Sequence, residues 1–136
     1  MRKILMAIAA TILPLSATDA NAANAPPKVR IAEIEIDPGQ LAAYKTLLAE
    51  EQEASVRLEP GVLMLHSAAI ATEPTQIRLL EVYADQAAYE AHIRSPHFLK
   101  YKTLTERMIK SLKLIEATPI LLCAKAGAAG PTDTCR

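Results

Sequence analysis

The sequence predicts an α+β protein with a ferredoxin-like fold, a split β-α-β arrangement in which an antiparallel sheet has helices on one face. The first reason is the order of the predicted elements, β-α-β-β-α(α)-β. The second is that apolar, β-branched segments alternate with amphipathic segments that begin at capping residues and prolines. The third is length, because 136 residues with a cleaved leader leave enough chain for one domain with one core.

Each predicted element has a local signal. Asp37-Pro38-Gly39 supplies an N-cap and a first-turn proline for the first helix, and Glu59-Pro60-Gly61 ends that helix. Asp85 and Ser95 stand where the N-caps of the two later helices belong, and Pro96 suits the first turn of the last one. In the first half of the chain we predict a strand over 29–36, a helix from Pro38 to about Leu58, and strands over 62–70 and 77–83 joined by a turn over 71–76. In the second half we predict a helix from Gln86, a helix from Pro96 whose apolar stripe extends to Leu112, and a strand over 113–117.

The N-terminal segment has the pattern of a signal peptide. A basic start is followed by an apolar run that is too short to span a bilayer, and Ala20-Asn21-Ala22 matches a small-x-small cleavage site. We therefore expect a removed leader over 1–22, a tether over 23–27, a domain over 28–123 and a C-terminal tail over 124–136. The expected location is the periplasm or the exterior of the cell.

The charge balance argues against two classes of partner. The chain has 15 basic and 15 acidic residues, so it has no excess positive charge to attract nucleic acid or an anionic membrane. It also lacks a glycine-rich phosphate loop and a dinucleotide fingerprint.

The strand over 62–70 predicts a homodimer. A sheet with one covered face alternates apolar and polar residues, whereas here both alternating sets are largely apolar. These sets are Val62, Met64, Ala68 and Ile70 on one side, and Leu63, Leu65 and Ala69 on the other. Since the chain offers no further domain to cover the second face, we expect a second copy of the sheet to cover it.

Cys123 and Cys135 are the only cysteines, and a short Gly/Pro/Ala-rich segment separates them. In an exported protein this arrangement predicts a disulfide. Metal binding by two cysteines without nearby histidines is the weaker alternative.

The candidate catalytic groups lie between Leu79 and Tyr101. His92 falls on the same helical arc as Ala88, Tyr89 and Ile93, so it points inward, either as a general base or as a buried histidine satisfied by the backbone. Glu81 and Tyr83 are two residues apart on one strand and share its apolar face. A carboxylate on that face needs a partner, which is a ligand or a structural hydrogen bond or ion pair.

Five further residues are candidates for substrate binding. Glu51 interrupts the apolar stripe of the first helix, so its carboxylate faces either solvent or a pocket. His97 stands in the first turn of its helix, where it is either exposed or functional, and His66 shares a strand face with apolar residues. Phe98 and Tyr101 belong to the apolar stripe of the last helix. We predict no metal site, because the histidines show no tight ligand spacing.

The motifs AEIEI-DPGQ, LEPGVL and LLEVYAD-QAAYEAHIRSPHFLKY together resemble the antibiotic biosynthesis monooxygenase (ABM) family, which includes quinol monooxygenase-like proteins. The resemblance extends over about 29–118, and its most specific parts are the Glu-Pro-Gly turn at 59–61 and the run from Glu81 to His97. It implies a dimeric α+β barrel with a pocket between sheet and helices. It also implies oxygen chemistry on a phenol or quinol without metal or flavin.

Two classes of function follow from these observations. The first is an enzyme, either a cofactor-independent monooxygenase of a small quinol or phenolic compound or an isomerase of a small enolisable carbonyl compound. The second is a small-molecule-binding stress protein without catalytic activity. The distinguishing feature is whether Glu81, Tyr83 and His92 converge on one cavity.

Overall fold

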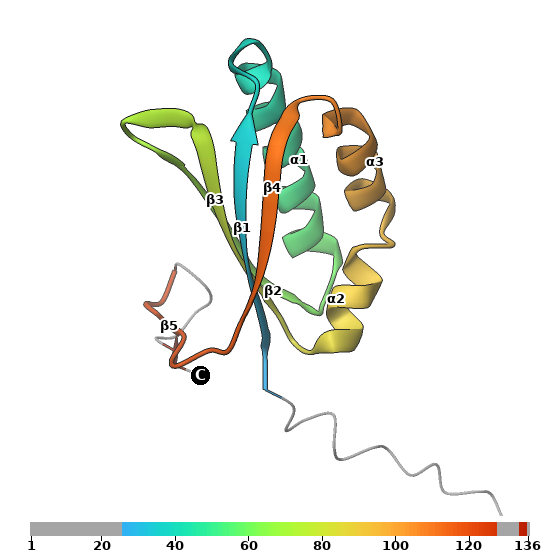
Figure 1. Ribbon diagram of the computed structural model, residues 1–136. Helices are drawn as coiled ribbons and strands as arrows, with labels where there is room; N and C mark the ends of the chain where they lie inside the picture. Colours follow the sequence, from blue (N-terminus) through green and yellow to red (C-terminus); the bar gives the residue numbers. More distant parts are fainter. Residues whose placement is uncertain (1–25, 128–133, 136) are drawn as a thin grey trace, which may run out of the picture.

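The computed structural model describes residues 26–127 and 134–135. Its main unit consists of strands β1 (Lys28–Ile36), β2 (Val62–Ile70), β3 (Glu73–Tyr83) and β4 (Ile109–Ala117), helices α1 (Leu41–Leu58), α2 (Gln86–His92) and α3 (Pro96–Thr105), and a short 3-10 helix, η2 (Pro38–Gln40). The four strands form one antiparallel sheet in the order β2-β3-β1-β4. The three α-helices lie on one face of this sheet (Figure 1). The predicted ferredoxin-like α+β fold is therefore confirmed. The predicted leader lies outside the described residues.

The predicted helix starts are confirmed by their caps. The Asp37 side chain accepts a hydrogen bond from the Gly39 N–H, and the Asp85 side chain accepts one from the Ala88 N–H. Ser95 Oγ accepts one from the Phe98 N–H, directly before the proline that opens α3. Each cap satisfies a backbone donor that the first turn of the helix leaves free.

Two predicted boundaries are wrong. α3 ends at Thr105 and β4 begins at Ile109, so Ile109 and Leu112 belong to a strand rather than to the stripe of the last helix. Short apolar segments fit a helical or a strand period equally well, and here pairing with β1 along the whole length of β4 decides the outcome. β3 begins at Glu73, within the predicted turn, because the β2–β3 hairpin extends as far as the pair Ile70 and Glu73.

The core lies between the sheet and α1. Its buried residues are Ala32, Ile34, Ile36, Tyr44, Leu48, Ile77 and Leu79. β1 and β3 place their members opposite each other, since Ala32 pairs with Leu79 and Ile34 pairs with Ile77. This face of the central strands is therefore fixed in register by apolar burial.

The turn between α1 and β2 brings α2 close to the end of α1. A Cβ on Gly61 would lie 2.4 Å from the Cβ of Ala88, so only glycine permits this approach. The Ala84 N–H also donates to the Gly61 carbonyl. The residue that ends α1, Glu59, is thereby held next to the C-terminal end of α2.

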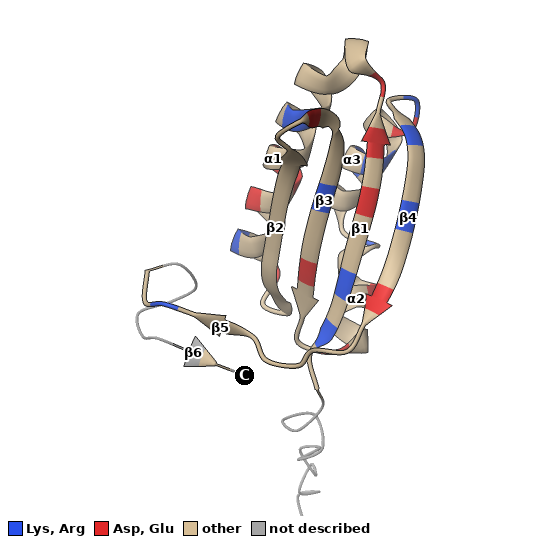
Figure 2. Cartoon of the chain, turned by 60° about the vertical axis from the view of Figure 1, so that its left-hand side comes forward, with Lys and Arg blue, Asp and Glu red and all other residues tan. Residues whose placement is uncertain are grey.

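Within the described residues, the opposite face of the sheet carries no helix, as Figure 2 shows with the sheet in front of the helices. β1 and β4 are linked by the cross-strand ion pairs Lys110–Glu35 at 3.2 Å and Lys113–Glu33 at 3.6 Å. These pairs are partly or largely exposed, so each contributes little to stability. No helix within the described residues has the length and apolar character needed to cross a membrane.

After the main sheet the chain forms a small ribbon, β5 (Cys123–Ala124) with β6 (Thr134–Cys135). The predicted disulfide between Cys123 and Cys135 is present and closes this ribbon. The preceding residues Ile120 and Leu121 are exposed.

Candidate active site

A cavity of about 460 Å³ lies between the inner face of the sheet and the helices. This volume is within the range of small-molecule sites. Its apolar lining includes Ala32, Ile34, Leu48, Leu65, Leu79, Ile93, Phe98, Ile109, Leu112 and Leu114. Its polar lining comprises Arg30, Glu51, Gln52, Glu81, Tyr83, Tyr89, His92, Tyr101, Lys102, Thr105 and Glu106.

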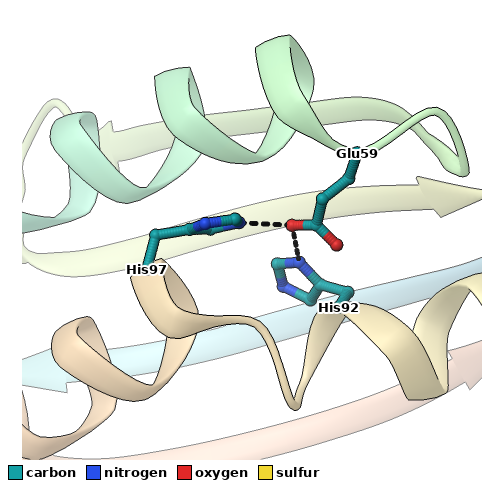
Figure 3. Close-up of side chains that lie close together, drawn as sticks. All are labelled: Glu59, His92 and His97. Carbon is teal, nitrogen blue, oxygen red and sulfur yellow. Dashed lines mark hydrogen bonds and ion pairs between the residues drawn. The ribbon is translucent and has the colours of Figure 1, made fainter.

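Two imidazoles meet at one carboxylate oxygen of Glu59, and one of them, that of His92, also lines this cavity (Figure 3). Oε1 of Glu59, the residue after α1, lies 3.0 Å from Nδ1 of His92 and 2.5 Å from Nε2 of His97. His92 ends α2, and His97 stands in the first turn of α3. The side chain of His92 is 3% exposed, that of His97 is 17% exposed and that of Glu59 is 15% exposed. Water therefore competes little for these contacts.

The arrangement keeps Glu59 ionised. Burial alone would raise the pKa of its carboxyl, but hydrogen bonds from His92 and His97 outweigh that effect and lower the pKa. A carboxylate only accepts, so each imidazole donates through the nitrogen that faces Glu59. For neutral His92 this assigns the proton to Nδ1 and leaves a lone pair on Nε2.

The free nitrogen of His92 faces a second carboxyl group. Nε2 lies 3.6 Å from Oε1 of Glu51, which accepts a hydrogen bond of 2.6 Å from Ser55 Oγ. Glu51 is buried, and burial raises the pKa of its carboxyl despite the Ser55 hydrogen bond and the nearby histidines. The imidazole therefore stands between an acid that ionises easily and one that holds its proton longer.

Aromatic rings fix the plane of the His92 imidazole. The ring centroids of Phe98 and Tyr83 lie 4.9 Å and 5.3 Å from that of His92. Tyr83 is fully buried, and its hydroxyl makes no hydrogen bond of normal geometry with any described residue. Burial, followed by the nearby Glu81 carboxyl, raises the pKa of Tyr83, which therefore stays a neutral phenol.

Glu81 and Arg30 form the wall at the other end of the cavity. They are direct cross-strand partners on β3 and β1. Burial raises the pKa of the Glu81 carboxyl, although the Arg30 charge partly offsets this effect. Arg30 Nη1 donates to the hydroxyl of Tyr89 on α2, and its guanidinium lies 4.6 Å from the centre of that ring.

Tyr101 joins the cavity to the core. Its hydroxyl lies 2.8 Å from the Tyr44 hydroxyl, and burial raises the pKa of both phenols. Neither group is therefore a candidate base at neutral pH.

A metal ion is the alternative occupant of the Glu59 cluster. Glu59, His92 and His97 each offer one ligand atom, and these atoms lie within 4.8 Å of one another. Two ligands of a tetrahedral zinc ion are about 3.3 Å apart, given bonds of about 2.0–2.1 Å. The contacts of 2.5 Å and 3.0 Å to Glu59 are shorter than that separation, so they fit shared protons better than a shared metal.

Comparisons with known proteins decide the family. The model of the family described as antibiotic biosynthesis monooxygenase matches residues 27–104, more than half of the chain. This chain belongs to the antibiotic biosynthesis monooxygenase family. The predicted resemblance is therefore confirmed. A search of curated proteins found no match.

Solved structures agree with this assignment to the ABM family. A proposed antibiotic biosynthesis monooxygenase from Bacteroides thetaiotaomicron is 49% identical, with a TM-score of 0.69, over 70% of this chain and 90% of that one. A protein from Pseudomonas aeruginosa is 25% identical, with a TM-score of 0.66, over 71% and 96% of the two chains. A proposed family member from Nitrosomonas europaea, 21% identical with a TM-score of 0.67 over 71% and 93%, shares the fold.

The ABM-type cavity brings together most of the residues proposed from the sequence. Those that line it are Glu51, Glu81, Tyr83, His92, Phe98 and Tyr101. His97 reaches the same site through Glu59 and lines a small adjoining hollow. His66 does not belong to it, because its side chain is exposed and lines a separate groove beside β2 and α1.

Sequence reasoning missed three groups of the site, namely Glu59, Arg30 and Tyr89. Glu59 was interpreted only as part of a helix-ending turn, although that turn is among the most specific parts of the family resemblance. Arg30 alternates with Ala32 and Ile34 on the inner face of β1, which was a usable signal for a charge inside the cavity.

Proposed function

We propose that this ABM-family protein is a cofactor-independent monooxygenase of a small quinol or phenolic compound, with His92 as the general base. The observation that carries the proposal is the position of the His92 imidazole. Glu59 holds Nδ1–H, so the lone pair of Nε2 remains beside the cavity. A well-placed base of this kind accelerates proton transfer by roughly 10²–10⁴-fold.

The proposed reaction balances without a cofactor. His92 takes a phenolic proton, and the electron-rich phenolate then reduces dioxygen. One oxygen atom enters the ring and the other leaves as water, so a hydroquinone and one dioxygen give a hydroxyquinone and one water. The substrate supplies all the electrons. The protein positions the ring, accepts and returns protons, and limits the access of bulk water to the reacting phenolate.

The same base also supports the alternative, an isomerase of an enolisable carbonyl compound. Removal of a proton from the carbon next to a carbonyl needs a base such as His92 and an acid at the oxygen. Glu81 is the candidate acid, because burial raises the pKa of its carboxyl. Recovery of a changed or an unchanged ligand distinguishes an isomerase from a binding protein without catalytic activity. Neither of these consumes oxygen, so one measurement separates the monooxygenase from both.

That measurement is oxygen uptake with a panel of hydroquinones, with an enzyme-free sample and added catalase to correct for autoxidation. The expected result is one dioxygen per quinol and incorporation of label from labelled dioxygen into the product. His92→Gln and His92→Ala should reduce turnover about 100-fold or more, with a stability change of ~1–2 kcal/mol. His66→Gln is the matched control, since this histidine is exposed outside the cavity.

Three results would contradict the proposal. Unchanged turnover in both His92 variants would remove His92 from the mechanism. A ligand that raises the melting temperature without any oxygen uptake would favour the binding function. Equal losses of folding and of activity in the variants would mark His92 as a structural residue.

We also propose that the protein acts as an exported homodimer. Within the described residues, no helix covers the outer face of the sheet, which supports a dimer. Disulfides form and persist mainly in oxidising compartments, which supports export. Light scattering at micromolar concentration should give twice the mass of the processed chain. N-terminal sequencing of the native protein should begin at Ala23.

A further inference from the structure

Arg30 is a cation in the wall of the cavity that forms no ion pair with any described residue. It lies on the inner face of β1, in alternation with Ala32, and lines the cavity. Glu81 is its direct neighbour across the sheet, and the Arg30 charge partly offsets the rise in the pKa of that carboxyl, but the two side chains form no ion pair. Lys28, two residues earlier on the same strand, does pair with Glu116. A partly buried charge without a contacting counter-ion is costly, so a ligand is a candidate for the missing contact.

Contacts with Tyr89 hold the Arg30 guanidinium in one orientation. Its Nη1 donates to the Tyr89 hydroxyl, and its face lies on the Tyr89 ring. This contact uses one of its five N–H donors. Nε is buried and has no hydrogen-bond partner among the described residues. The guanidinium therefore has an unpartnered donor in the wall of the cavity.

The remaining charges of the cavity favour an anion at this wall. Apart from the exposed Glu106, the carboxyl groups that line the cavity are those of Glu51 and Glu81. Burial raises the pKa of both, so they compete less strongly for the Arg30 charge than ordinary carboxyls would. Lys102 and Glu106 also line the cavity; both are exposed and their charges are opposite.

We infer that Arg30 is an anchor for an oxyanion of the substrate, so that the cavity selects small aromatic compounds bearing a carboxylate or a second ring oxygen besides the reacting hydroxyl. The guanidinium fork suits such an oxygen, and the apolar walls suit the ring. The inference rests on the proposed function only in treating this ligand as a substrate. Binding of the ligand is independent of turnover.

The test measures binding by calorimetry under anaerobic conditions. The probes are 2,5-dihydroxybenzoate, its uncharged methyl ester, and hydroquinone. The proteins are the wild type, Arg30→Gln, Arg30→Lys and the control Arg107→Gln, which removes an exposed charge outside the lining of the cavity. A melting curve for each variant verifies folding, and Arg30→Lys keeps the charge if Arg30→Gln proves unstable.

A carboxylate anchor predicts that the acid binds at least 10-fold more tightly than the ester, and that Arg30→Gln removes this preference. Arg30→Lys should restore part of it, because the charge remains but the fork is lost. If a ring oxygen is the anchored group, the acid, ester and hydroquinone should bind alike, and all three should weaken about 10-fold in Arg30→Gln. Arg107→Gln should change affinity less than two-fold in either case.

Three outcomes would overturn the inference. They are undiminished affinity in folded Arg30→Gln and Arg30→Lys, an equal loss in Arg107→Gln, and no binding of any probe to the wild type. Oxygen uptake separates this proposal from the preceding one. Tight Arg30-dependent binding without oxygen uptake would remove the monooxygenase and leave the anchor. Oxygen uptake whose kinetics are unchanged in Arg30→Gln would support the monooxygenase and remove the role of Arg30 as an anchor.

Discussion

Replacing Glu59 by glutamine tests whether this residue orients the catalytic imidazole. The side chain keeps its size but loses its charge, and its amide can present either an oxygen or an NH₂ group. In the wild type, Oε1 accepts hydrogen bonds of 3.0 Å and 2.5 Å from His92 and His97. The variant keeps at most two neutral hydrogen bonds, and an amide NH₂ turned toward His92 Nδ1 would move the imidazole proton to Nε2.

The expected magnitudes follow from these two contacts. Hydrogen bonds to charged groups contribute about 1.5–3 kcal/mol and neutral ones about 1 kcal/mol, so Glu59→Gln should cost about 1–2 kcal/mol of stability. For a domain of this size the melting temperature should fall by roughly 5–15 °C. A proton on Nε2 blocks the base, so oxygen uptake should fall about 100-fold or more.

The pH dependence of this cost has a definite sign. The folded pKa of Glu59 is lowered below its ordinary value of 4.5, so its contribution is present above that pH and is lost as the pH falls through the folded pKa. Melting curves of wild type and variant should therefore differ at neutral pH and converge in acid.

Glu50→Gln is the matched control for this variant. Glu50 lies on the same helix and pairs with Lys100 at 3.0 Å, but both side chains are more than half exposed. Its loss should change neither stability nor turnover measurably. Full oxygen uptake by folded Glu59→Gln would refute the assigned role of Glu59, as would a stability difference that grows in acid.

Three further variants test the fold and the electrostatics around the site. Glu51→Gln should become more stable than the wild type as the pH rises above 4.5, because burial raises the Glu51 pKa and its ionisation opposes folding; urea titrations at several pH values would measure this. Gly61→Ala should lower the free energy of unfolding by about 1–3 kcal/mol, because the new Cβ would lie 2.4 Å from that of Ala88. The control Gly39→Ala places its Cβ 3.2 Å from a side-chain oxygen and should cost less in the same melting experiments. The denatured native protein should show no titratable thiol, and the double variant Cys123→Ser, Cys135→Ser should keep the main fold, because the disulfide closes a ribbon outside the main sheet.

The fold could be predicted because its signals are local. Asp85 and Ser95 cap helices within three residues of the N–H groups that they satisfy. The start of β4 could not be predicted, since Ile109 and Leu112 fit both a helical stripe and a strand, and only pairing with β1 distinguishes the two. Propensity alone did not contain that information.

The candidate site was partly predictable for the same reason. His92 and Tyr83 were recognisable from one short stretch, because their own element determines the face on which each lies. Glu59 is separated from His92 and His97 by 33 and 38 residues, and no local pattern links them. Their meeting depends on the Gly61 turn packing against α2, a tertiary contact that a single sequence does not display.

The three acidic groups of the site illustrate how one fold gives similar side chains different roles. Glu59 has two imidazole donors, which lower its pKa, so it serves as the fixed negative charge that orients His92. Glu51 has a single hydroxyl donor, and Glu81 faces an arginine that does not contact it; burial dominates and raises both pKa values. A base at His92 Nε2 therefore lies between a carboxyl that ionises more readily than usual and carboxyls that ionise less readily. Environments that push the pKa values of neighbouring acids apart are typical of proton-transfer sites.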